Sequence, residues 1–180
     1  MCSLINNKFI LHFICLSEHY TTSQNLSTIS LDNYYLPSNF SCINHTGAGA
    51  CIFTGADLQY TISDVSQFCI EKTFVDCATE LHLGNYYIIV ICIYRSPAGN
   101  FLNFFNQLDS TLKYLYNTET QFIVCGDLNV DFSKHSNFKL LSCLLQSYFC
   151  SILWILLLGL TTLNILLLIT SLQIIPDSIY

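Results

Sequence analysis

The chain has 180 residues, which is the size of one domain and enough to bury a hydrophobic core. Only 10% of the residues are charged and 52% are hydrophobic, and this composition excludes a disordered protein. The formal net charge of -6 lacks the basic excess of most nucleic-acid binders. It does not exclude a nuclease, because a bound divalent cation reverses the local field where a phosphate docks.

The first half of the chain contains several strand-like segments. Residues 9–16 (FILHFICL) form an apolar run interrupted by His12 and predict a buried first strand. The alternative, the hydrophobic part of a signal peptide, lacks a clear cleavage site. Residues 48–54 predict a second strand, and residues 68–83 contain two strand-like pieces, QFCIEKTF and VDCATELHL. Residues 86–94 (YYIIVICIY) are continuously apolar, which indicates a strand buried on both faces.

Two helices and another strand are predicted next. Apolar side chains recur at steps of three and four within residues 100–116, which indicates an amphipathic helix that begins after the Pro97 turn. Residues 121–125 (QFIVC) predict a buried strand, and residues 138–148 predict a second helix. The succession of strand, helix and strand predicts α/β layering.

Residues 149–180 differ from the rest of the chain. No charged residue occurs between Lys139 and Asp177, and residues 152–175 are dominated by leucine and isoleucine. A segment of this length predicts a hydrophobic C-terminal helix that could cross a membrane. The basic residues before it weakly favour a cytoplasmic N-terminal side. The alternative is an extension translated out of frame.

The ten cysteines follow no metal-binding or disulfide pattern. No CxxC pair occurs, and Cys92 and Cys125 lie inside apolar runs. We therefore expect reduced, buried thiols and no structural zinc site. Asn25, Asn39 and Asn44 begin glycosylation triplets, but this pattern is short and common and carries little weight.

Polar side chains follow three of the predicted strands. Glu18 and Asp127 each come directly after an apolar run, and Asn129 lies two residues beyond Asp127. Tyr94 and Arg95 end the most hydrophobic strand. Side chains at the ends of adjacent strands converge on one site, and two carboxylates there could hold Mg²⁺. The alternative is that these residues are ordinary turn and capping residues.

Four sequence blocks in this order resemble the endonuclease/exonuclease/phosphatase superfamily. They are ICLSEHY (14–20), GAGACIF (47–53), YRSP (94–97) and FIVCGDLNVDF (122–132). The form they resemble is the apurinic-like endonuclease domain of non-LTR retrotransposons. Each block alone is weak, but four blocks in order over about residues 10–148 make a specific pattern.

The resemblance implies a role for each matching residue. Glu18 would ligate the catalytic Mg²⁺, for which Mn²⁺ is an alternative, and Tyr94 would lie at the scissile phosphate with Arg95 binding the phosphate beside it. Asp127 would orient or deprotonate the attacking water, and Asn129 would bond the phosphate. The implied reaction is metal-assisted hydrolysis of a phosphodiester in DNA.

The remaining histidines are interpreted as structural. His12 is expected to be a core histidine with its hydrogen bonds satisfied, and His19 a structural neighbour of Glu18. His82 is expected in a strand before a hairpin turn at Gly84 and Asn85.

The resemblance also implies an α/β fold over residues 1–148, an incomplete four-layer sandwich in which two packed mixed β-sheets are flanked by helices. Two family features are missing. An asparagine of the family's first strand has no counterpart, since neither Asn6 nor Asn7 qualifies. A terminal Ser-Asp-His block is absent, and His135 and Asp177 lie outside any such block. We therefore expect a domain truncated at both ends and catalytically impaired.

Two other functions fit parts of the sequence. One is a membrane-anchored protein without enzymatic activity, held by residues 152–175, and carbonate extraction would identify it. The other is a phosphoesterase of the same superfamily that acts on inositol lipids or small phosphoesters. The resemblance implies a nuclear or cytoplasmic location, and insertion of the tail implies a membrane. No protein partner can be predicted.

Overall fold

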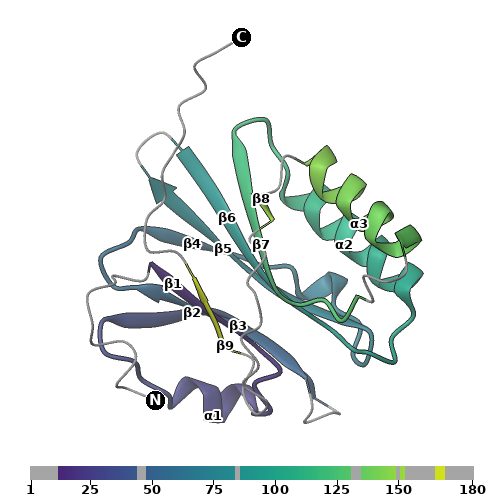
Figure 1. Ribbon diagram of the computed structural model, residues 1–180. Coiled ribbons are helices and arrows are strands. Elements are labelled where there is room, and N and C mark those ends of the chain that lie inside the picture. The colour runs from purple at the N-terminus through teal and green to yellow at the C-terminus, as the bar shows by residue number, and fades with distance from the viewer. Residues whose placement is uncertain are drawn as a thin grey trace.

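The computed structural model describes residues 12–43, 48–83, 86–130, 135–148, 151–152 and 165–168, in which strands and helices are interspersed along the chain (Figure 1). The strands are β1 (Phe13–Ser17), β2 (Tyr34–Ser41), β3 (Gly49–Gly55), β4 (Tyr60–Ser63), β5 (Phe74–Leu83), β6 (Tyr86–Arg95), β7 (Thr120–Asp127), β8 (Ser151–Ile152) and β9 (Ile165–Leu168). The helices are α1 (Ser23–Ser27), the 3-10 helix η1 (Ser66–Phe68), α2 (Phe101–Leu115) and α3 (His135–Ser147).

The strands form two sheets. One sheet has the order β2-β3-β1-β9, and every strand pair in it is antiparallel. The other has the order β4-β5-β6-β7-β8 and is mixed, because β6 with β7 and β7 with β8 are parallel pairs. Helix α2 connects the parallel strands β6 and β7, the kind of crossover that a parallel pair requires.

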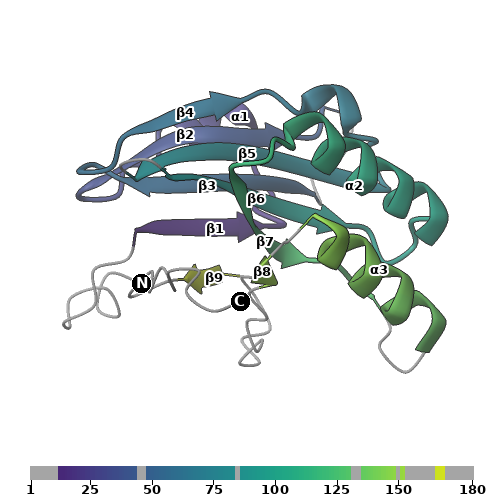
Figure 2. The same ribbon diagram turned by 90° about the horizontal axis from the view of Figure 1, so that it is seen from above.

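The two sheets and the helices stack as four layers (Figures 1 and 2). Between the sheets, Phe13 and Ile52 of the first sheet pack against Ile88 and Val90 of the second. Helices α2 and α3 cover the outer face of the five-stranded sheet, and α1 inserts Leu26 on the outer face of the four-stranded sheet. The expected α/β architecture of two sheets flanked by helices is confirmed, although the described part of the first sheet is antiparallel rather than mixed.

Strand β6 and helix α2 form where the sequence predicts them. Residues Ile88–Ile93 of β6 are all at most 2% exposed, because one face packs on the first sheet and the other on α2 and α3. Helix α2 buries Phe104, Leu108 and Leu112 on its inner face. The Asn100 side chain begins this helix by accepting a hydrogen bond of 3.0 Å from the amide of Asn103.

Several elements differ from the sequence prediction, and α1 and β4 are among those that it did not include. The piece QFCIEKTF is not a strand: it forms the end of η1 and a turn in which Lys72 has a φ of 67°. Strand β2 was not predicted, because Pro37 interrupts it. The register shifts between Tyr35 and Ser38, so the proline lies in a bulge of an edge strand, where its missing N–H is tolerated.

The hydrophobic tail is described at only two places. Ser151–Ile152 pairs with β7, and Ile165–Leu168 pairs with β1, so these residues are strands rather than parts of the predicted helix over residues 152–175. The rest of that segment lies outside the described residues. Among the helices that the structure describes, none is long and apolar enough to cross a membrane.

Candidate active site

Three strand ends from the two sheets meet at one rim of the sandwich. Glu18 follows the last residue of β1, while Tyr94 lies at the end of β6 and directly opposite Asp127 of β7. The Tyr94 phenol donates a hydrogen bond to the Glu18 carboxylate, which joins the first sheet to the second. The structure thus brings together three of the residues that the sequence analysis selected.

The electrostatics of the site show that the two carboxylates interact. Burial raises the pKa of Tyr94, and the hydrogen bond to Glu18 and the charges of Glu18 and Asp127 raise it further. Burial also raises the pKa of Asp127, and the Glu18 charge adds to this effect, while hydrogen bonds from Asn129 oppose it. The rim therefore concentrates negative charge that a bound cation would neutralise.

A reciprocal set of hydrogen bonds joins Asn129 to the end of β6. The Asn129 amide donates to Oδ1 of Asp127 at 3.0 Å, and its side-chain Nδ2 donates to the Arg95 carbonyl at 2.7 Å. In return, Nη1 of Arg95 donates to the Asn129 carbonyl at 2.5 Å. These bonds fix the chain after β7 and orient the Asp127 carboxylate.

The Arg95 guanidinium is buried beneath α2. The residue is 7% exposed, and its Nη2 donates to the Gly99 carbonyl at 2.7 Å. Its central carbon lies 5.9 Å and 5.6 Å from the ring centroids of Phe101 and Phe104, in cation–π range. Both terminal nitrogens of Arg95 therefore contact main-chain carbonyls, which differs from the phosphate contact that the resemblance implies.

The backbone is strained at the same rim. Glu18 has a φ of 53° and Asn129 a φ of 44°, in the left-handed region that non-glycine residues seldom occupy. Gly126 has a φ of 112°, and a Cβ atom at this position would overlap the main chain of Ile93. Strain of this kind persists only where surrounding contacts maintain it, and it is concentrated at functional sites.

His19 lies beside Glu18 in a structural role, as expected. Its Nε2 donates to the Phe40 carbonyl at 3.2 Å, and its Nδ1 accepts from the Thr21 amide at 3.4 Å, an arrangement that defines a neutral tautomer. Burial lowers the pKa of His19. The ring also packs where a Cβ atom of Gly49 would lie, so this position requires glycine.

His82 and His12 lie away from the rim. His82 is in β5, its Nε2 is 3.1 Å from Oε1 of Glu80, and β5 and β6 form the predicted hairpin. The expectation that His12 is satisfied is wrong, because its Nδ1 is buried with no hydrogen-bond partner among the described atoms. The side chain of His135, together with Asn6, Asn7 and Asp177, lies outside what the structure describes.

Asp76 is a buried carboxylate outside the rim that the sequence analysis missed. It is 1% exposed in β5 and accepts hydrogen bonds from Thr111 at 2.9 Å and from the Cys69 thiol at 3.1 Å. Burial raises the pKa of Asp76 to about 7, although these hydrogen bonds lower it in part. A pocket of about 160 Å³ borders this residue. That volume is below the roughly 300 Å³ at which ligand pockets begin.

Within the described ranges, side chains at the rim and in the core offer donor atoms for a metal ion. The carboxylates of Glu18 and Asp127 provide hard oxygen donors at the rim. The thiols of Cys15, Cys92 and Cys125 lie within 4.8 Å of one another in the core. None of the eight cysteines with described side chains forms a disulfide, and six of them are buried as expected, whereas Cys69 is half-buried and Cys143 is exposed.

Comparison with known proteins assigns no family to the chain. No family model matches it, and no curated protein matches it. A functional interpretation therefore depends on the rim residues and on the four sequence blocks.

Proposed function

We propose that the chain is a Mg²⁺-dependent phosphodiester hydrolase domain of the endonuclease/exonuclease/phosphatase superfamily, in the form found in non-LTR retrotransposons, that nicks DNA at a greatly reduced rate. One observation carries the proposal. Glu18, Tyr94 and Asp127 come from separate strands of two sheets and from three of the four resembling blocks, yet they lie together at one rim.

The rim residues fit a magnesium ion. Mg²⁺ in phosphate-transferring sites keeps several waters and is held by one or two carboxylates together with the substrate phosphate. Glu18 and Asp127 are close enough for the charge of one to raise the pKa of the other, and a cation between them would remove this repulsion. When bound, the ion would stabilise negative charge on the phosphate during hydrolysis.

The surrounding residues orient the substrate and the attacking water. The Asp127 carboxylate, which the Asn129 amide holds in place, would orient the attacking water and accept its proton. The Tyr94 hydroxyl can donate to a phosphate oxygen in place of Glu18. Arg95 acts as a positioning residue, since its hydrogen bond to the Asn129 carbonyl maintains the loop that holds the Asp127 carboxylate.

We attribute the reduced rate to the lack of an acid–base histidine among the described residues at the rim. Both ring nitrogens of His19 contact the main chain, and the 180-residue sequence contains no Ser-Asp-His block. No group is then assigned to protonate the leaving 3′-oxygen. Loss of one member of a coupled catalytic set costs orders of magnitude in rate.

Nicking of supercoiled plasmid tests the proposal. We expect slow nicking that requires Mg²⁺, is abolished in Asp127→Asn and is unchanged in Asp57→Asn. Asp57 is a matched control because it is exposed in the turn after β3, at the opposite end of the first sheet from Glu18. Added imidazole should accelerate the wild-type chain by supplying the missing proton donor, and it should not rescue Asp127→Asn.

Two outcomes contradict the proposal in different ways. Nicking that is equal in the wild type and Asp127→Asn, with or without imidazole, would refute the assignment of the rim as a phosphodiesterase site. Nicking as fast as that of a complete enzyme of the superfamily would refute the claim of a reduced rate.

A further inference from the structure

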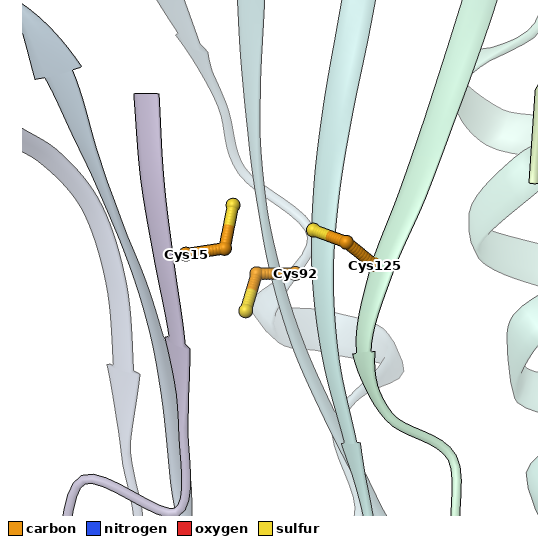
Figure 3. A group of neighbouring side chains, drawn as sticks. All are labelled: Cys15, Cys92 and Cys125. Carbon is orange, nitrogen blue, oxygen red and sulfur yellow. The ribbon is translucent and has the colours of Figure 1, made fainter. Parts of the chain in front are cut away.

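Three cysteine thiols from three strands meet in the layer between the sheets (Figure 3). Cys15 belongs to β1 of the first sheet, while Cys92 of β6 and Cys125 of β7 are direct neighbours in the parallel pair of the second. In Figure 3 the three side chains extend into the space between β1 and the pair β6 and β7. Their sulfur atoms all lie within 4.8 Å of one another, so one ion could contact all three.

The cluster is shielded from water. Cys15 and Cys92 are 0% exposed and Cys125 is 4% exposed. Most side chains packed around them in this core layer are apolar, such as Phe13, Ile52 and Val90. A fourth buried thiol, that of Cys77, is hydrogen-bonded to Cys92, but it is not one of the three whose sulfur atoms all lie within 4.8 Å of one another. Two of these thiols donate weak hydrogen bonds to the main chain, Cys92 to the Leu16 carbonyl at 3.5 Å and Cys125 to the Ile91 carbonyl at 3.3 Å.

The donor set favours a soft, monovalent ion. Thiolates select soft ions such as Cu(I), whereas structural zinc takes four ligands in a tetrahedron and the group contains three. Burial keeps water from supplying a fourth ligand, and the Cys77 thiol contacts Cys92 without belonging to the group whose three sulfur atoms surround one position. Excess charge is costly in an apolar layer. A single thiolate balances the charge of a monovalent ion, whereas a divalent ion would need two.

We propose that Cys15, Cys92 and Cys125 form a three-sulfur binding site for one Cu(I) ion. This site is separate from the magnesium site at the rim and does not depend on the proposed nuclease function. Binding forms copper–sulfur bonds, and each thiol that becomes a thiolate releases its proton to water. No electron is transferred, because copper enters and remains as Cu(I).

The position of the site determines how it is loaded. Cys92 and Cys125 each lie two residues before a rim residue, Tyr94 and Asp127, and therefore about 7 Å below the rim on the same strands. Since the layer is closed, the ion enters when the two sheets separate or while the chain folds. Loading should therefore be efficient during refolding and slow for the folded protein.

The test measures copper retained by the full-length chain. The protein is refolded without oxygen, with reductant and Cu(I), and then dialysed against a Cu(I) chelator. We expect about one copper per chain, with only sulfur neighbours in X-ray absorption spectra. We also expect the thermal midpoint to rise by about 5–10 °C at a free-ion concentration about 100 times the Kd.

Single substitutions identify the ligands. Cys15→Ala, Cys92→Ala and Cys125→Ala should each reduce retained copper at least about tenfold. Cys51→Ala should retain it, and this is a matched control because Cys51 is also 0% exposed but packs on the outer face of the first sheet. Circular dichroism identifies any variant that fails to fold. For such a variant, the test of the proposal depends on the X-ray absorption spectra and the thermal midpoint of the wild type.

Three results would overturn the proposal. The first is a wild-type chain that retains no copper after dialysis. The second is retention that is equal in the wild type and the three cluster variants. The third is retention of Zn²⁺ in preference to Cu(I) when both are supplied, since this would contradict the argument from ligand number and charge.

Discussion

Replacing Arg95 by methionine removes the contacts that hold the Asn129 loop against β6. The guanidinium donates to the carbonyls of Asn129 and Gly99, at 2.5 and 2.7 Å, and lies over the rings of Phe101 and Phe104. Methionine has a stem of similar length and preserves most of the packing beneath α2, so the substitution isolates the polar contacts.

The expected loss of stability follows from these contacts. A hydrogen bond to a charged group contributes about 1.5–3 kcal/mol, and two such bonds are lost. Part of this loss is offset because the wild-type fold must remove the guanidinium from water, which costs free energy, and methionine has no charge to desolvate. We therefore expect the free energy of unfolding to fall by about 3 kcal/mol, which lowers the thermal midpoint by about 6–12 °C in a chain of this size.

Urea unfolding followed by circular dichroism measures this change. The matched control is Lys113→Met, which removes a positive charge from the exposed side of α2 and should change the free energy of unfolding by less than about 0.5 kcal/mol. The reasoning would be refuted if Arg95→Met lost less than about 1 kcal/mol, because the guanidinium would then not hold the loop.

Three further predictions concern the rim and the buried carboxylate. Gly126→Ala should destabilise the fold by about 3 kcal/mol or more in urea unfolding, because the added Cβ atom overlaps the Ile93 main chain, and a loss below about 1 kcal/mol would contradict the strained geometry. Since the pKa of Asp76 is raised to about 7, the folded chain holds this proton above the ordinary carboxyl pKa. The free energy of unfolding should therefore fall as the pH rises from about 4 to about 7, by up to about 4 kcal/mol, and urea unfolding of Asp76→Asn should show no such fall. Glu18→Gln should lower the pKa of Asp127, as measured by carboxyl-carbon NMR titration, and an unchanged pKa would show that the two carboxylates do not interact.

Much of the fold could be predicted because it depends on local patterns. The apolar run of β6 and the three-to-four spacing in α2 are strong signals, and both elements form where expected. Strand β2 lacks such a signal, since Pro37 and the bulge beside it hide the alternation of exposed and buried residues. The tail residues 165–168 form a strand that pairs with β1 over a long distance in the sequence. Apolar composition alone does not distinguish such a strand from a helix.

The site could be predicted only in part, for a related reason. Strand-end position predicts that Glu18, Tyr94 and Asp127 converge, because β6 and β7 are parallel and β1 ends beside them. The direction of the Arg95 guanidinium depends on the turn at Gly99 and on the Asn129 loop, and no local pattern encodes it. The three-thiol cluster likewise depends on how the two sheets are aligned, which spacing along the chain does not show.

The most direct test of the central claim, that Glu18 and Asp127 hold one divalent cation together, is a calorimetric titration with Mg²⁺. The wild type and Asp57→Asn should each bind one ion with equal affinity, and Glu18→Gln and Asp127→Asn should each bind at least about tenfold more weakly. Equal affinity of the wild type and Glu18→Gln for Mg²⁺ would contradict the claim.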